Sequence, residues 1–107
     1  MFDTLFCNAR IVDGTGTPWF WGSLGVQDGF VAAVLPRTTK PLSRHTIVLE
    51  GGILCPGFVD GHSHSERPLL SGEPTDCKTM QGVATENLGL DGMSLAPIKD
   101  GDKADWK

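Results

Sequence analysis

The sequence lacks several features that would assign a function class directly. Its 107 residues include no run of about 18 apolar residues, so we expect no membrane-spanning helix. Lys and Arg form no block that would bind phosphates, and the net charge is −4, so we expect no nucleic-acid partner. Asp3 and Arg10 interrupt the apolar residues near the start, so we expect no secretory signal.

Cysteine is also scarce. The three cysteines, Cys7, Cys55 and Cys77, are an odd number and include no C-x-x-C pair. A disulfide framework pairs its cysteines, so this number and spacing favour reduced thiols in a cytoplasmic protein. Hydrophobic residues make up 39% of the chain, which is enough to supply the core of one small domain.

Residues 1–55 have the pattern of a small β module. The stretch DTLFCNARIVDG predicts a first strand, which ends at the Gly-, Thr- and Pro-rich turn of residues 13–18. Asp28-Gly29 lies between two apolar segments and predicts a type I′ hairpin turn, because glycine adopts positive φ without steric cost. The stretch HTIVLEGGILCPGF predicts a second strand pair around Gly51-Gly52.

The pattern changes after Pro56. The stretch GFVDGHSH, residues 57–64, predicts a new strand. A polar segment with two prolines follows, and it predicts only a short helix near residues 74–81. VATENLGL, residues 83–90, predicts the next strand, and the remaining residues are rich in turn formers.

Two of the three histidines, His62 and His64, stand one residue apart in this new strand. Side chains alternate between the faces of a strand, so both imidazoles would point to the same side. Such a pair can bind one metal ion, since imidazole is the commonest protein ligand for zinc, or it can be a solvated strand end. The third histidine, His45, has no partner in the sequence, and we assign it no role.

Nearby charged residues allow two interpretations each. Asp60, two residues before His62, either orients an imidazole from behind the metal site or makes a strand-end turn. Asp91 follows the next predicted strand and is either an oxygen ligand at the same rim or part of an Asp-Gly turn. Arg67 can bind a substrate carboxylate, or it is an ordinary loop charge together with Glu66.

These stretches resemble a known family. PGFVDGHSHSE, residues 56–66, is similar to the first barrel strand of the amidohydrolase superfamily, whose signature is PGF-(I/V)-D-x-H-x-H. The stretch ARIVDGTGTPWFWGSLGVQDGFVAAV resembles the opening of the N-acyl-D-amino-acid deacylase (D-aminoacylase) branch, and HSHSERPLL, QGVAT and GLDGMSLAP match that branch at the expected spacing. The resemblance covers nearly all of residues 3–98.

The resemblance implies an α/β architecture in two parts. Residues 1–55 would be the N-terminal portion of a small β-sandwich, and residues 56–107 would be the first strands of a metal-dependent (β/α)₈ barrel. It implies that His62 and His64 bind Zn²⁺ or another divalent metal, with one or two ions in the complete site. Asp91 stands where many members have a cysteine ligand. The implied substrate is a small-molecule N-acyl-D-amino acid, whose amide is hydrolysed.

Length separates this chain from a complete barrel. A (β/α)₈ barrel needs about 250 residues, so we expect an N-terminal fragment that is inactive alone, with its general base outside the chain. Two alternatives remain: a non-catalytic β module that self-associates through exposed strand edges, and an imidase of the dihydropyrimidinase or dihydroorotase type. The imidases share the H-x-H pair but not the flanking motifs. The coding sequence beyond Lys107 would distinguish a clipped enzyme from a remnant.

Overall fold

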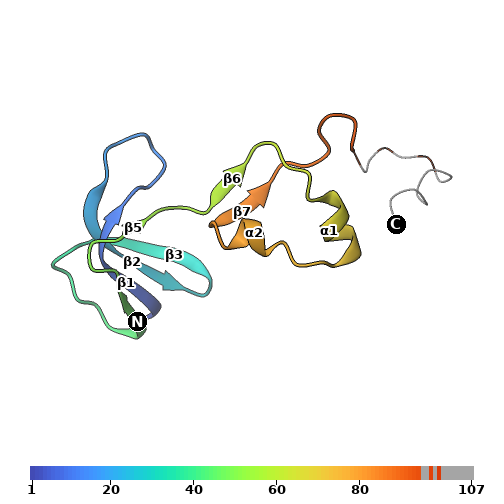
Figure 1. The fold of residues 1–107 in the computed structure, drawn as a ribbon. Helices are drawn as coiled ribbons and strands as arrows, with labels where there is room; N and C mark the ends of the chain where they lie inside the picture. The colour runs from blue at the N-terminus through green and yellow to red at the C-terminus, as the bar shows by residue number, and fades with distance from the viewer. Residues whose placement is uncertain (95–96, 98, 100–107) are drawn as a thin grey trace. The chain divides into compact units, whose positions relative to one another are not determined.

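The chain divides into two compact units in a computed structural model that describes residues 1–94, 97 and 99 (Figure 1). The first unit spans Met1–Pro56, and the second begins at Gly57. No helix among the described residues is long and apolar enough to cross a membrane. The turn-rich stretch predicted for the end of the chain lies largely outside the described residues.

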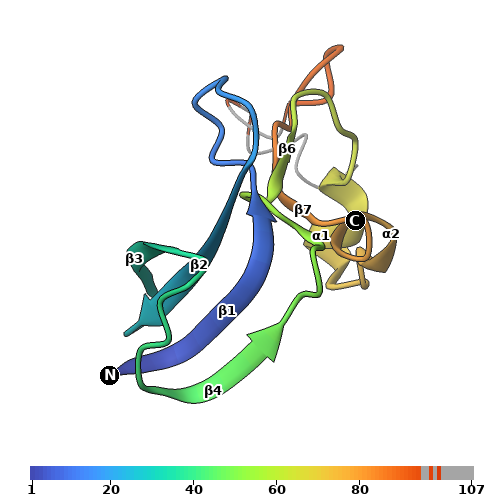
Figure 2. The same cartoon turned by 90° about the vertical axis from the view of Figure 1, so that its left-hand side faces the viewer.

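The first unit is a five-stranded sheet built around its first strand. Its strands are β1 (Phe2–Ile11), β2 (Phe20–Gln27), β3 (Phe30–Pro36), β4 (Ser43–Val48) and β5 (Ile53–Leu54). The order is β3-β2-β1-β4, and β5 also pairs with β1. Figure 2 shows β1 between β2, which runs antiparallel to it, and β4, which runs parallel.

A tight turn joins β2 and β3 as the sequence predicts. Gln27 pairs with Phe30, and the two residues between them have φ values of 52° (Asp28) and 80° (Gly29). Positive φ at both central residues is the type I′ geometry, whose twist matches that of the flanking strands. The predicted hairpin at Asp28-Gly29 is therefore confirmed.

The strand pair predicted around Gly51-Gly52 is wrong. β4 and β5 do not pair with each other; both run parallel to β1, at successive positions along its edge. The Gly52 N–H donates to the Leu49 carbonyl at 2.7 Å, and the Gly51 N–H donates to the Asn8 carbonyl at 2.8 Å. These bonds close a short loop beside the irregularity in β1 at Asn8, whose φ is 55°. The chain therefore continues in its original direction instead of reversing.

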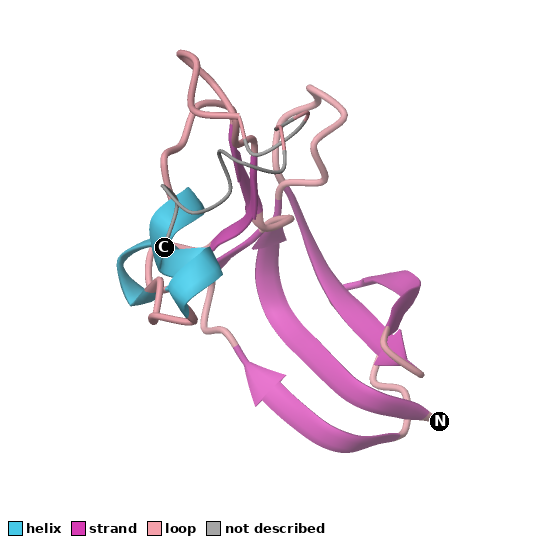
Figure 3. Cartoon of the chain, turned by 90° about the vertical axis from the view of Figure 1, so that its right-hand side faces the viewer, coloured by secondary structure: helices cyan, strands magenta, loops and turns pink. Residues whose placement is uncertain are grey.

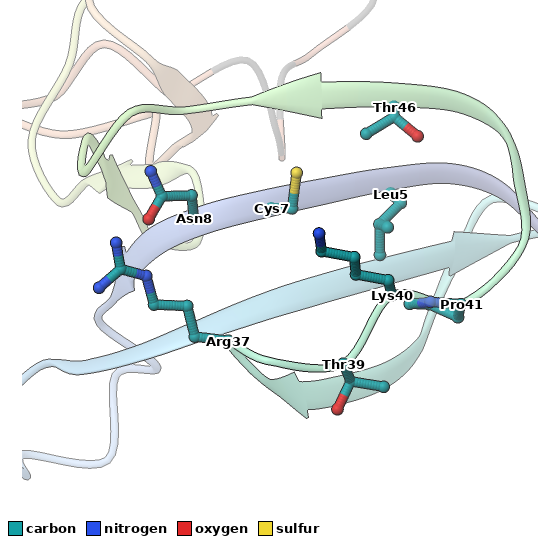
Figure 4. Close-up of a pocket in the computed structure, with 8 residues that line it drawn as sticks. All are labelled: Leu5, Cys7, Asn8, Arg37, Thr39, Lys40, Pro41 and Thr46. Atoms are coloured by element: carbon teal, nitrogen blue, oxygen red, sulfur yellow. The ribbon is translucent and has the colours of Figure 1, made fainter.

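The buried apolar side chains of the first unit come from β1. Leu5, Ala9 and Ile11 are each less than 5% exposed. A cavity of about 490 Å³ lies beside this strand, lined partly by Cys7, Asn8 and six other residues of the first unit (Figure 4). None of the residues proposed from the sequence for metal or substrate binding lines this cavity.

The second unit contains two parallel strands joined through two short helices. Its elements are β6 (Phe58–Asp60), α1 (Glu66–Ser71), α2 (Asp76–Thr79) and β7 (Val83–Glu86) (Figure 3). The helix predicted near residues 74–81 is confirmed as α2, and the strand predicted from residue 83 is confirmed but ends at Glu86. Helix α1 was not predicted; Pro68 lies in its first turn, where the missing N–H is tolerated, and Gly72 ends it with φ 71°.

Replacing Gly29 tests the turn. In Gly29→Ala the added Cβ meets no atom within 4 Å, so steric contact is not at issue, but φ of 80° is unfavourable for an L-residue. We expect a loss of about 1 kcal/mol in the free energy of unfolding. Urea unfolding followed by tryptophan fluorescence measures it. Gly29→Asn is the matched control and should lose less, because Asn adopts this conformation more readily; equal losses would contradict the turn assignment.

Candidate metal site

The loop after β6 carries the two histidines. Strand β6 ends at Asp60, so the strand predicted through residue 64 is four residues too long. The Asp60 Oδ1 accepts a hydrogen bond from the His62 backbone N–H at 3.1 Å, and such a side-chain bond two residues on makes a turn. The Asp60 carboxylate thus makes a strand-end turn and contacts the backbone of His62.

This loop is tied to the loop after β7. The Asn87 N–H donates to the Asp60 carbonyl at 2.8 Å, and the Ser63 N–H donates to the Asn87 carbonyl at 3.1 Å. Backbone pairing thus continues past the ends of β6 and β7. As a result, the residues that follow each strand lie at the same end of this two-stranded sheet.

Three of the residues singled out from the sequence converge there. The Nε2 atom of His62 lies 2.9 Å from Asp91 Oδ2, and the Nε2 atom of His64 lies 3.6 Å from the same oxygen. One potential ligand atom from each residue lies within 4.8 Å of the others. The two rings have centroids 5.2 Å apart, so they share one side of the loop although they lie beyond the strand.

Asp91 lies in a tight turn and also faces the histidines. Asp91 and Gly92 have φ values of 53° and 80°, and the Met93 N–H donates to the Leu90 carbonyl at 2.9 Å. Aspartate is one of the few residues other than glycine that adopts positive φ without large strain. The two interpretations of Asp91 from the sequence are thus compatible, because the turn brings its carboxylate to the imidazoles.

The donor atoms suit a tetrahedral metal ion. Nitrogen and oxygen ligands about 2.0–2.1 Å from a tetrahedral zinc lie roughly 3.3 Å from one another. The distances of 2.9 and 3.6 Å from Asp91 Oδ2 to the two imidazole nitrogens lie on either side of that value. All three side chains are solvent-exposed, between 41% and 67%, so an ion can reach them. The residues present therefore fit a divalent metal of the zinc type.

Residues that alternate with the histidines are buried and hold the loop in place. The hydroxyls of Ser63 and Ser65 both donate to Glu86 Oε2, the Ser65 bond at 2.6 Å. These bonds, the Ser63 bond foremost, lower the pKa of the Glu86 carboxyl. The sequence reasoning missed this set, although the alternation H-S-H-S already indicates that the serines face away from the metal, toward the strand that contains Glu86.

An ion pair between helix α2 and strand β6 also supports the histidine loop. Lys78 in α2 donates to Asp60 Oδ2, and both side chains are about three-quarters buried. The hydrogen bond from Lys78 lowers the pKa of Asp60, and the same bond raises the pKa of Lys78. This ion pair fixes helix α2 to the end of β6. It therefore also fixes the residue from which the histidine loop begins.

Glu66 and Arg67, which follow the histidines, differ in their surroundings. Glu66 is only 1% exposed, and its Oε1 accepts a hydrogen bond from the Gly89 N–H at 2.8 Å. The interpretation of Glu66 as a loop charge is therefore wrong: it begins α1 and is buried. Arg67 is exposed on α1 and is not among the three converging residues. His45 lies in β4, in the first unit.

Known proteins resemble this chain over most of its length. No model of a protein family matches it. It is 36% identical over 98 residues to D-aminoacylase from Alcaligenes xylosoxydans xylosoxydans, a match that covers 91% of this chain and 20% of that protein. A solved structure of D-aminoacylase, described for its binuclear metal centre, matches with a TM-score of 0.81 at 34% identity, over 92% of this chain and 20% of that one.

A further solved structure extends the likeness. N-acyl-D-glutamate deacylase from Bordetella bronchiseptica, complexed with zinc and a phosphonate inhibitor, matches with a TM-score of 0.72 at 35% identity, over 82% of this chain and 18% of that one. Fold and sequence thus resemble those of N-acyl-D-amino-acid deacylases (D-aminoacylases) of the amidohydrolase superfamily, and the chain matches the N-terminal region of these proteins. It spans about one fifth of the length of the curated relatives it matches.

The Asp60–Lys78 pair predicts a specific pH dependence. The folded-state pKa of Asp60 lies below its ordinary value of 3.8, so the pair stabilises the fold above that pH and is lost as the pH falls through the folded value. In Lys78→Met, the Asp60 carboxyl should titrate at a higher pH than in the parent, closer to 3.8.

Carboxyl ¹³C NMR resolves this midpoint directly. Lys40→Met removes the same charge from the first unit and serves as the control, in which Asp60 should titrate as in the parent. An unchanged Asp60 midpoint in Lys78→Met would show that the ion pair does not form in solution.

Proposed function

We propose that this chain supplies the first part of the active site of a metal-dependent N-acyl-D-amino-acid deacylase. The reaction is hydrolysis of the amide bond of an N-acyl-D-amino acid, which gives a carboxylate and a D-amino acid. The observation that carries the proposal is the convergence of His62 Nε2 and His64 Nε2 on one oxygen of Asp91. The likeness to D-aminoacylase over 91% of the chain supports it.

Each residue of the converging set has a proposed role. His62 and His64 bind a zinc ion through Nε2, and Asp91 binds it through Oδ2. The N-acyl-D-glutamate deacylase that matches this chain is complexed with zinc, and the matching D-aminoacylase has a binuclear centre, which supports one or two ions. A bound zinc ion would polarise the amide carbonyl and activate a water molecule. Ser63 and Ser65, by bonding Glu86, keep the histidine loop in one conformation.

Arg67 is the proposed contact to the substrate. Its guanidinium is exposed at the start of α1, three residues after His64. A planar guanidinium binds a carboxylate through two parallel hydrogen bonds, and an N-acyl amino acid has one free carboxylate. None of the described residues is assigned as the general base, which we place in a part of the protein outside this chain.

The division of the chain into two compact units supports a proposal of two domains. Residues 1–55 would contribute strands to a β-sandwich, and residues 56–107 would begin a (β/α)₈ barrel. The parallel pairing of β6 and β7 through intervening helices supports this proposal, because such a barrel repeats that unit eight times. A barrel of about 250 residues also fits within the length of a relative of which the matched residues are 20%.

A competing proposal is that the chain acts as a β module that associates with copies of itself. β3 and β4 form the two edges of the first sheet, and Phe30 and Val31 in β3 are 76% and 63% exposed. Unpaired edge strands with exposed apolar residues favour pairing between chains. Sedimentation of the 107-residue chain distinguishes this alternative, which requires a defined oligomer with no dependence on His62 or His64.

Zinc binding by this chain is the first test. The set offers three ligands, one of them on a turn, whereas a closed zinc site has four, so we expect affinity weaker than about 1 μM and rapid release to a chelator. Isothermal titration calorimetry measures the affinity, and a chelator added to the zinc-loaded chain tests the release. His62→Ala and His64→Ala should each abolish the binding heat, and His45→Ala, the matched control, should retain it. Sub-micromolar affinity, or heat that survives in His62→Ala, would contradict the proposed ligand set.

Amide hydrolysis by the product of the complete reading frame is the second test. It should release acetate from N-acetyl-D-amino acids and not from the L-enantiomers, and the activity should fall at least a hundredfold in His64→Ala. The 107-residue chain alone should show no turnover. Dihydrouracil is the comparison substrate, because an imidase would open its ring. Preference for dihydrouracil would replace the deacylase proposal with the imidase.

A further inference from the structure

Glu66 is a buried carboxylate with one oxygen in use. Its side chain is 1% exposed, and Oε1 accepts a hydrogen bond from the Gly89 N–H at 2.8 Å. Its other oxygen, Oε2, is buried and accepts no hydrogen bond from any described residue. A buried polar atom without a partner is costly, so native proteins seldom leave one without a function.

The unused oxygen faces the second histidine. Oε2 of Glu66 lies 4.0 Å from His64 Nδ1, while Nε2 of the same ring lies 3.6 Å from Asp91 Oδ2. His64 thus has a carboxylate beside each of its two ring nitrogens. A neutral imidazole carries one N–H, and the nitrogen without it is the one that can bind a metal.

We propose that Glu66 is a positioning residue for His64: its Oε2 accepts a hydrogen bond from Nδ1–H and thereby leaves Nε2 as the metal-binding nitrogen. This inference rests on the proposed function, in which His64 binds a metal. Metal-binding histidines almost always donate their other N–H to a carboxylate, a carbonyl or water. A movement of about 1 Å would bring the two atoms to hydrogen-bonding distance.

Glu66 also contacts the second loop of the site. Gly89, which donates to Oε1, lies two residues before Asp91. One carboxylate therefore connects the loop that carries His64 with the loop that carries Asp91. The connection to Gly89 alone would be a structural role, so a test must separate the two oxygens.

Glu66→Gln makes this separation. The amide oxygen can still accept a hydrogen bond from the Gly89 N–H, but an NH₂ group in the place of Oε2 cannot accept one from His64 Nδ1–H. We expect zinc affinity to fall 10- to 100-fold, the range seen when such partners of metal ligands are removed. Glu73→Gln removes the same charge from an exposed position and should bind zinc as the parent does. Calorimetry gives the affinities, and the Gly89 amide shift reports whether the loop is retained.

The histidine tautomer provides the decisive readout. Long-range ¹H–¹⁵N NMR of the chain at saturating zinc should show His64 protonated at Nδ1 and bound through Nε2, and Glu66→Gln should reduce this tautomer. Coordination through Nδ1 in the parent, where no substitution can disturb the fold, would overturn the inference. So would an unchanged tautomer and affinity in Glu66→Gln.

Failure of the proposed function has a different signature. If the parent binds no zinc through His62 and His64, the deacylase proposal fails, and the inference is judged on the metal-free chain. There, protonation of His64 at Nδ1 that is lost in Glu66→Gln supports the positioning role. The same tautomer in both chains contradicts it.

Discussion

The parallel pairing of β6 and β7 is the constraint on which the candidate site depends. Both strands are short, and Gly57 just before β6 is packed so closely that a Cβ would lie 2.4 Å from the Ala84 Cβ. This contact, with the backbone bonds that follow it, fixes the register between the two loops. A slip of one residue would turn every side chain to the opposite face, so His62 and Asp91 would no longer meet.

Around this frame the acidic side chains divide into two groups. Among the described residues of the second unit, Asp60, Glu66 and Glu86 each accept hydrogen bonds from a lysine, a backbone N–H or two serine hydroxyls, and each has a lowered pKa. Their charge is thus largely balanced by groups of the fold itself. Asp91 differs from these three: it is 67% exposed, and its Oδ2 faces the imidazoles, as the metal-ligand role proposed for it requires.

The sequence predicted what local chemistry decides and missed what distant contacts decide. Asp28-Gly29 specifies a turn whatever surrounds it, so the hairpin was recognisable. The H-x-H pair was recognisable from its spacing, although the two histidines lie in the loop past the end of β6 and not in a strand. Gly51-Gly52 between two apolar segments has the local pattern of a hairpin. The chain does not reverse there because both flanking segments, β4 and β5, pair with β1 in the same direction. The burial of Glu66 depends on Gly89, 23 residues away, and no pattern near Glu66 distinguishes it from an exposed loop charge.

The arrangement of β1 has a consequence for the order in which the first sheet assembles. Its antiparallel partner is complete once Gln27 has been made, but its parallel partners extend to Leu54. At about 5–20 residues per second, a translating ribosome leaves that edge of β1 unpaired for a few seconds. During this interval the nascent chain presents a free strand edge, so polysomes that crowd such chains favour pairing between neighbours before each sheet closes.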